Sequence, residues 1–320
     1  MIALVGVALY AGNAAYEAGN LSGAALGVEA IAGEGAFAPA IVGLAGVAGA
    51  LLLTGRYAVS ERALIALVAV MTLAFAATFA ITRPDLGALF AGLFTPDIPE
   101  GALLTVVALI GTTIVPYNLF LHASAVARKG GSAKDLGAVR ADASLSIGIG
   151  GLIAILIAST AAASLFAQGL AVENAGDMAR QFEPLFGVYS RYLLGVGLLA
   201  AGLTSAITAP MATGFAMAEI LRLPSEAKSF AFRAVALSVL AIGAALSLAG
   251  VRPVEVILAA QFANGLLLPV IAGFLLYAMN RSQVLGRYVN GWIANGAGFL
   301  VVLVAAGLGL RLVLRTLGWL

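Results

Sequence analysis

The chain has 320 residues, of which 62% are hydrophobic and 10% charged, and its formal net charge is +2. Soluble domains carry about a quarter charged residues, so this composition excludes a soluble globular protein, and the small net charge gives no sign of a nucleic-acid partner. Because the chain holds no cysteine, one histidine and no HExxH motif, disulfides, thiolate metal sites, multi-histidine metal sites and a zincin protease are also excluded.

Nine apolar segments follow one another, most of them close to or above the roughly 20 residues that a helix needs to cross a bilayer. They are too long and too continuously apolar for the ~10-residue alternating strands of an outer-membrane barrel. The breaks between them are short and polar and leave no room for a soluble domain. We therefore predict an all-α polytopic membrane protein with residues 1–320 in a single transmembrane domain. The predicted spans are 2–31, 37–54, 61–82, 101–128, 141–167, 189–220, 229–249, 254–279 and 290–315.

Lysine and arginine predict the orientation of these spans. Alternate breaks, at 54–62, 128–140, 222–233 and 281–287, hold 11 of the 17 basic residues, whereas the other set holds most of the acidic ones. Because basic loops stay in the cytoplasm, we expect a multi-pass protein of the cell (inner) membrane with its N-terminus inside and its C-terminus outside. Residues 1–31 do not fit a signal peptide, because they lack a basic start and the apolar run is too long.

The first predicted span contains the polar stretch GNAAYEAGN at 12–20. Glu17 lies deep in the span, with Asn13 four residues before it and Asn20 three residues after it, so that a helix would place them on one face. A carboxylate inside a span costs several kcal/mol. Two interpretations stay open: a polar seam between helices, or a carboxylate that carries protons or an ion.

The fourth predicted span contains GTTIVPYNLFLHAS at 111–124. Pro116 lacks an N–H and clashes with the carbonyl group one turn back, so it interrupts a helix. Asn118 is a residue type that caps the start of a helix. The stretch therefore predicts two half-helices, 101–113 and 119–128, on either side of a non-helical break.

Such a break has two possible meanings. Unpaired carbonyl groups at mid-membrane, at the negative end of the first half-helix, suit a cation, and discontinuous helices are typical of transporter binding sites. A simple proline kink explains the same residues equally well. His122, four residues after Asn118 on the same face, either hydrogen-bonds a neighbouring helix or takes part in proton movement or gating.

The eighth predicted span contains QFANGLLLP at 261–269, in which Gln261 and Asn264 lie three residues apart and share a helix face. The sixth contains GLTSAITAPMATG at 202–214, where hydroxyl groups and a proline indicate close helix packing.

These motifs resemble those of the Nramp family of divalent metal transporters. The stretch at 111–124 is similar to that family's sixth-helix signature GATVMPHNLYLHS. Residues 14–25 resemble its third helix, with Glu17 at the family's aspartate and Asn20 at its glutamate. Residues 200–208 resemble the eighth helix, and 261–269 keep the glutamine-to-proline spacing of the tenth. The signature positions that match are Gly111, Thr113, Pro116, Asn118, Leu119, Leu121 and His122.

The resemblance implies a fold of the leucine-transporter type, with two inverted five-helix repeats, in which the nine spans are helices three to eleven. Helices one and two of the family, with the DPGN motif of helix one that supplies principal metal ligands, have no counterpart in the sequence. The chain is accordingly expected to be an N-terminally truncated piece of the transporter that does not transport alone.

The departures from the family bear on the ion. The family's metal-binding methionine falls at Val115 and its next histidine at Tyr117. Thioether sulfur favours softer transition metals, so its loss shifts the expected ion from manganese or iron toward Mg²⁺, as in the Nramp-related magnesium transporters. Leu203 and Asn20 replace a glutamine and a glutamate, which puts proton symport in doubt, although Glu17 and His122 leave a proton route open.

The resemblance thus implies a secondary transporter of a divalent cation, by alternating access, with the metal as cargo and no cofactor. Thr112 and Gln261 are the expected metal ligands, through a carbonyl and an amide oxygen; Val115, Tyr117, Asn118 and Asn264 line the site. An amino-acid carrier of the same fold and a non-transporting fragment or membrane scaffold stay open as alternatives. An intramembrane enzyme is not expected, because no catalytic pair is present.

Overall fold

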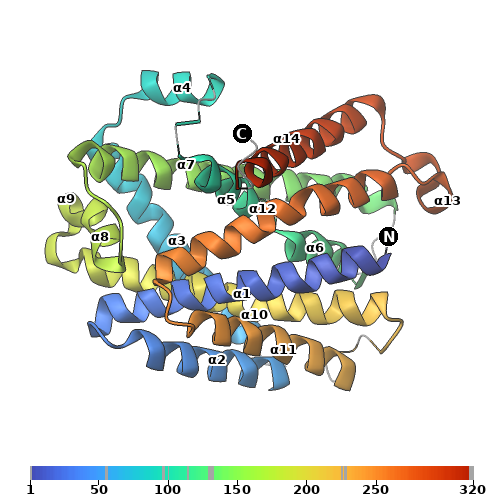
Figure 1. Ribbon diagram of the computed structural model, residues 1–320, viewed down its shortest axis with the longest axis horizontal. Coiled ribbons are helices and arrows are strands. Elements are labelled where there is room, and N and C mark those ends of the chain that lie inside the picture. Colours follow the sequence, from blue (N-terminus) through green and yellow to red (C-terminus); the bar gives the residue numbers. More distant parts are fainter. Residues whose placement is uncertain are drawn as a thin grey trace.

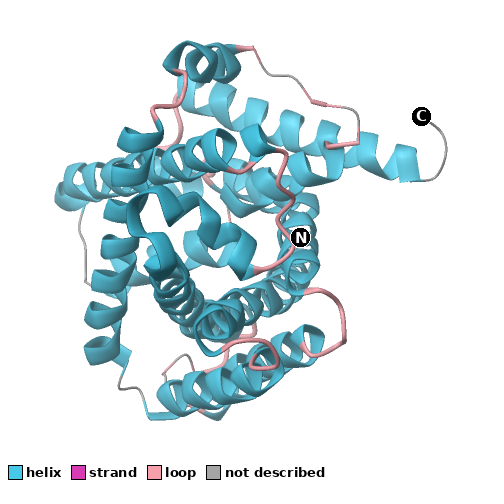
Figure 2. Cartoon of the chain, turned by 90° about the vertical axis from the view of Figure 1, so that its left-hand side faces the viewer, coloured by secondary structure: helices cyan, strands magenta, loops and turns pink. Residues whose placement is uncertain are grey.

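The computed structural model describes residues 2–54, 57–95, 98–99, 101–113, 115–128, 133–224, 226 and 229–316, and the regular structure within them is entirely helical (Figures 1 and 2). Eight stretches of this described part are long and apolar enough to cross a membrane. The prediction of an all-α polytopic membrane protein is therefore confirmed. The long helices are α1 (Ile2–Ala32), α2 (Phe37–Thr54), α3 (Tyr57–Thr82), α5 (Leu103–Thr113), α6 (Pro116–Arg128), α7 (Leu136–Ser164), α10 (Ser190–Ile220), α11 (Phe230–Ser247), α12 (Pro253–Ala278) and α14 (Trp292–Thr316).

The predicted spans agree with these helices to within a few residues at most ends, because apolar length is a property of the local sequence. The first predicted span differs from the others in hydropathy: α1 has 31 residues but is not one of the eight apolar stretches. Its polar residues lower its hydropathy, and much of it is buried by other helices instead of facing lipid. The predicted number of nine spans is therefore reached only when α1 is counted together with the eight apolar stretches.

Short helices occupy several of the predicted polar breaks between the spans. They are α4 (Leu86–Phe94), α8 (Ala175–Ala179), α9 (Glu183–Phe186) and α13 (Ser282–Leu285). Local caps start two of them: the Asp85 carboxylate accepts from the N–H of Ala88 at 3.1 Å, and the Asn174 side chain accepts from the N–H of Asp177 at 2.9 Å. Capping supplies partners for the first N–H groups of these helices, which would otherwise have none.

Helix α1 lies at the centre of the helix assembly and contacts α2, α10, α11 and α12 (Figure 1). Its contact with α10 is a backbone contact. A Cβ atom on Gly27 would lie 2.6 Å from the nitrogen of Leu199, and one on Gly202 would lie 2.6 Å from the nitrogen of Ala24. Small residues allow this approach, which within a membrane supplies the packing that holds helices together.

A second close contact joins α5 to α12. A Cβ atom on Gly111 would collide with the carbonyl oxygen of Gln261 and would lie 2.9 Å from the Cα atom of Gly265. In the reverse direction, a Cβ atom on Gly265 would lie 2.8 Å from Cγ1 of Val107. These two glycines therefore place the C-terminal end of α5 directly against the middle of α12.

The Gly111 contact gives a stability prediction. In Gly111→Ala the new methyl group meets main-chain atoms of α12 that cannot move aside, so we expect a loss of about 1–3 kcal/mol, the usual cost of overpacking. Thermal unfolding of the purified protein in detergent measures this loss as a lower melting temperature. Gly273→Ala is the matched control, because nothing lies within 4 Å of a Cβ atom at that position of α12. Equal melting temperatures for the two variants would contradict the contact.

Single cysteines introduced by mutation test the expected orientation, because the chain has no native cysteine that would react. Glu34, between α1 and α2, and Gln283, on α13, are both exposed. With the N-terminus inside, Glu34→Cys reacts with a membrane-impermeant maleimide added to intact cells, and Gln283→Cys reacts only after the membrane is permeabilised. The reverse pattern would overturn the predicted orientation, and the cysteine-free parent is the blank.

Candidate metal site

The predicted break in the fourth span is confirmed, and it is shorter than expected. Helix α5 ends at Thr113, Val115 is not helical, and α6 begins at Pro116; residue 114 lies outside the described residues. Proline begins α6 readily, because its fixed φ suits the first helical position, where a backbone N–H has no helical partner in any case. The second half-helix was predicted to begin at 119, so that boundary was wrong by one turn.

The predicted capping role of Asn118 is also wrong. Its backbone N–H donates to the carbonyl oxygen of Val115 at 3.1 Å, within the first turn of α6, so Asn118 already lies inside the helix. The physical reason is that Pro116 starts the helix and no later side chain is needed to cap it. The Asn118 side chain is exposed, as is that of His122 one turn later. Their roles in lining and gating stay predictions.

Three of the predicted residues meet around Tyr16 of α1. The Tyr16 side chain lies close enough to the side chains of Thr112 and Gln261 to interact with both. It also packs on a buried cluster formed by Val115, which is 3% exposed, and two alanines of α10. The structure thus brings the end of α5, the break and α12 together on one tyrosine.

Tyr16 was not among the predicted site residues. A signal was present, because Tyr16 follows Asn13 by three residues and precedes Asn20 by four, so a helix places the three on one side. Glu17 was predicted instead, because it is the only carboxylate in the 12–20 stretch. Tyr117, the tyrosine that was selected, has its side chain outside the described part of the structure, as does Pro116, so its lining role stays a prediction.

Asn264 and Asn13 are fully buried one turn further along the same two helices. The Nδ2 group of Asn13 donates to Oγ1 of Thr213 on α10 at 2.7 Å. Asn264 faces α1, where a Cβ atom on Gly12 would lie 3.2 Å from its Oδ1 atom. Thr213 was missed, because within a hydroxyl-rich packing segment nothing in the sequence distinguishes it from its neighbours.

Glu17 is fully buried and faces a different neighbour. Its Oε2 atom accepts from Nδ2 of Asn20 at 3.1 Å, and a Cβ atom on Gly243 of α11 would lie 2.7 Å from its Cβ atom. The predicted common face of Asn13, Glu17 and Asn20 is therefore divided: Asn20 bonds to Glu17, whereas Asn13 bonds to α10. The structure does not bring Glu17 and His122 together in any contact between described residues.

The arrangement offers oxygen donors of low charge. No group of three Asp, Glu or His side chains that could hold a metal occurs within the described ranges. Five side chains keep a buried oxygen atom without a hydrogen-bond partner within the described ranges, four of them on α1 and α12 and one, Gln181, before α9: Asn13, Glu17, Gln181, Gln261 and Asn264. Amide, hydroxyl and carbonyl oxygens of this kind are the donors that hard cations such as Mg²⁺ accept.

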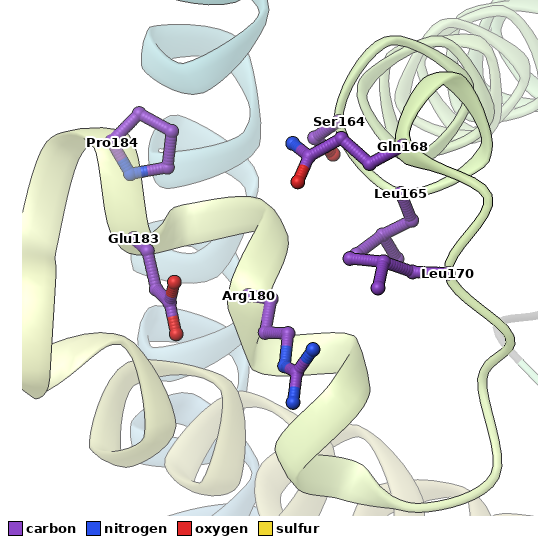
Figure 3. Close-up of a pocket in the computed structure, with 7 residues that line it drawn as sticks. All are labelled: Ser164, Leu165, Gln168, Leu170, Arg180, Glu183 and Pro184. Atoms are coloured by element: carbon purple, nitrogen blue, oxygen red, sulfur yellow. The ribbon is translucent and has the colours of Figure 1, made fainter.

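A separate pocket of about 600 Å³ contains none of the predicted site residues. Figure 3 shows Ser164 and Gln168 on one of its walls and Glu183 and Pro184 on the opposite wall. Arg180 also lines it, and its guanidinium group lies 4.0 Å from the Asp177 carboxylate. The pocket is therefore formed by the end of α7 and the segment of short helices that follows it, and it is distinct from the break.

Comparison with known proteins agrees with the resemblance seen in the motifs. The model of the natural resistance-associated macrophage protein-like (Nramp) family matches residues 1–315. The divalent metal cation transporter MntH of Caldanaerobacter subterraneus subsp. tengcongensis is 26% identical over 269 residues, which are 80% of this chain and 62% of that protein. MntH of Nostoc sp. is 30% identical over 278 residues, 82% of this chain and 62% of that protein.

A third relative, MntH of Pectobacterium carotovorum subsp. carotovorum, is 26% identical over 252 residues, 76% of this chain and 59% of that protein. The chain thus spans about three fifths of the length of these curated relatives. The family match, in contrast, runs over nearly the whole chain. On that match, the chain belongs to the Nramp family.

Proposed function

We propose that this protein is a secondary transporter that moves a divalent metal cation across the cell membrane by alternating access. The observation that carries the proposal is the contact of Tyr16 with Thr112 and Gln261, which joins the broken helix to α12. Gln261 keeps a buried Oε1 atom without a partner beside this junction. The relatives named divalent metal cation transporters support the class of cargo.

The ligands we propose are the carbonyl group of Thr112 and the Oε1 atom of Gln261, with Asn118 and Tyr117 completing the lining. Both ligands are hard oxygen donors. Val115 presents hydrocarbon where a thioether would favour a soft ion, so the proposed cargo is Mg²⁺ in preference to Mn²⁺ or Fe²⁺.

The proposal includes a route for proton symport. Glu17 is the carboxylate best placed for it, because it is fully buried and its Oε1 atom has no partner among described residues. His122, exposed on α6, is the second titratable group. Uptake driven by an imposed pH gradient, in native protein and in Glu17→Gln, separates a coupled from an uncoupled transporter.

The metal site itself is tested by uptake of Mg²⁺ and Mn²⁺ into proteoliposomes that contain the protein expressed from its native gene. In Gln261→Ala we expect uptake to fall by roughly tenfold or more, because losing one ligand of a charged cargo costs about 1.5–3 kcal/mol. In Asn118→Ala, which removes a lining amide and no proposed ligand, we expect a smaller fall. Gln168→Ala is the control, since Gln168 is exposed and lines the separate pocket. Unchanged uptake in both site variants would remove this site, and no uptake by the native protein would favour a membrane scaffold.

The ion preference is tested by restoring sulfur at the break. In Val115→Met the thioether gives a soft ligand, so we expect uptake to shift from Mg²⁺ toward Mn²⁺ by about tenfold in relative rate. Leu121→Met is the matched control, because Leu121 packs on the same buried cluster but lies in α6 beyond the break. Equal shifts in the two variants would mean that position 115 does not face the ion.

A further inference from the structure

We propose that a groove between α6, α12 and α14 binds one acyl chain of an anionic phospholipid, whose phosphate group is held by Arg281 and Arg287 in the loop at the end of the groove. The proposal concerns a lipid partner of the protein. It does not depend on the transported ion or on the metal site.

The groove has a volume of about 230 Å³ and an almost entirely apolar lining. Its walls are Leu119 of α6, Gly298 and Val301 of α14, and four residues of α12 between 272 and 279. The four residues recur every three or four positions, so one face of α12 lines the groove over about 10 Å. Since Leu119 lies in the first turn of α6, a bound chain contacts the half-helix that begins at the break.

Gly298 sets how closely α14 approaches α12 beneath this groove. A Cβ atom at Gly298 would lie 2.8 Å from Cδ1 of Leu276, so any side chain there would displace Leu276 and occupy the space between the two helices. The groove therefore exists because α14 presents a bare backbone at this position.

One end of the groove reaches the surface of the membrane. The apolar stretch of α12 ends at Ala278 and that of α14 begins at Trp292, and Met279, which lines the groove, is the first residue of the loop between them. Tyr277, Tyr288 and Trp292 are exposed around this loop. Exposed aromatic residues are typical of the level where lipid headgroups meet the hydrocarbon. An acyl chain in the groove thus has its headgroup at the loop.

Hydrogen bonds between asparagine side chains hold the loop in place. Nδ2 of Asn280 donates to Oδ1 of Asn295 at 2.7 Å, and Nδ2 of Asn295 donates back to Oδ1 of Asn280 at 2.8 Å. The N–H of Asn290 donates to the carbonyl oxygen of Met279 at 3.0 Å. These bonds tie the start of α14 to the end of α12, so the loop is a fixed platform beside the groove.

The charge of the loop defines the headgroup. Arg281 lies over the ring of Tyr277, 4.9 Å from its centroid, and Arg287 lies 5.1 Å from the centroid of Tyr288. Neither arginine forms an ion pair with a described residue, and residues 256–320 contain no aspartate or glutamate. A guanidinium group donates to phosphate oxygens through several N–H groups. Basic residues next to a span attract anionic lipids in this way.

A lipid fits this face better than a second copy of the chain. A two-fold interface places the same surface of both copies in contact, so it would bring Arg281 and Arg287 of each copy together with no acidic residue of the loop to pair with them. A phospholipid supplies the missing negative charge at the loop and hydrocarbon for the groove.

The charge requirement is tested by native mass spectrometry of the purified protein in detergent, titrated with phosphatidylglycerol or with phosphatidylcholine of the same chains. We expect the native protein to bind phosphatidylglycerol roughly tenfold more tightly or better. In the double variant Arg281→Gln, Arg287→Gln this preference should disappear. Arg191→Gln is the matched control, because Arg191 lies over Tyr192 in the same manner on α10, at the opposite end of the helix assembly from α13 (Figure 1).

The chain requirement is tested by filling the groove. Val301→Trp should lower the affinity for both lipids roughly tenfold or more, because the indole takes the place of the chain. Leu303→Trp is its control, since Leu303 is equally a residue of α14, is exposed and does not line the groove. Glycerol 3-phosphate, which has a phosphate and no chain, should not compete with phosphatidylglycerol. Melting temperatures check that each variant is folded.

Several results would overturn the lipid site. They are equal affinity of the native protein for the two lipids, unchanged phosphatidylglycerol binding in either the arginine double variant or Val301→Trp, and competition by glycerol 3-phosphate at the concentration of the lipid. A dimer of the native protein that Val301→Trp dissociates would assign the groove to a second copy instead. None of these results bears on metal uptake, so the transport proposal is tested separately.

Discussion

The structure depends on burying one polar helix, α1, inside a membrane protein. Its carboxylate, amides and hydroxyls cannot face lipid, so the backbones of neighbouring helices must come close enough to supply partners. Glycine makes this possible on several sides: Gly27 and Gly202 bring α10 to van der Waals contact, and Gly243 does the same for α11 against Glu17. With α1 enclosed in this way, its polar residues point at defined positions of α10, α11 and α12.

The second constraint is the contact of α5 with α12 at Gly111 and Gly265. It fixes where the first half-helix ends relative to Gln261, and the proline at the start of α6 makes the chain leave the helix at that level. A break alone would only bend a span. A break held against Gln261, with Tyr16 in contact with both sides, is the geometry on which the proposed cation site rests.

The buried polar groups divide into two kinds, and the division carries the functional argument. Ser22, Ser247, Tyr10 and Ser238 pair with one another or with backbone and act as helix contacts. Asn13, Glu17, Gln261 and Asn264 on α1 and α12, together with Gln181 elsewhere, keep oxygen atoms without a partner in the described structure. Unpaired buried groups lower stability, and four of these five lie along α1 and α12, the two helices on which the proposed metal site rests.

The sequence alone determined the helical class, most span limits, the break before Pro116 and the family, because apolar length, proline geometry and the 111–124 motif are local properties. It also singled out Gln261 and Asn264 as a polar pair. It placed the restart of the helix at the wrong residue, because the choice between Pro116 and Asn118 as the starting residue depends on neighbouring turns. Only the tertiary structure decided that Tyr16 joins Thr112 to Gln261, and that Asn13 turns toward Thr213 and away from Glu17. Asn13 and Thr213, for example, are 200 positions apart in the chain. Such contacts depend on how each helix is rotated and shifted against its neighbours, and the glycine contacts between helices set that rotation and shift.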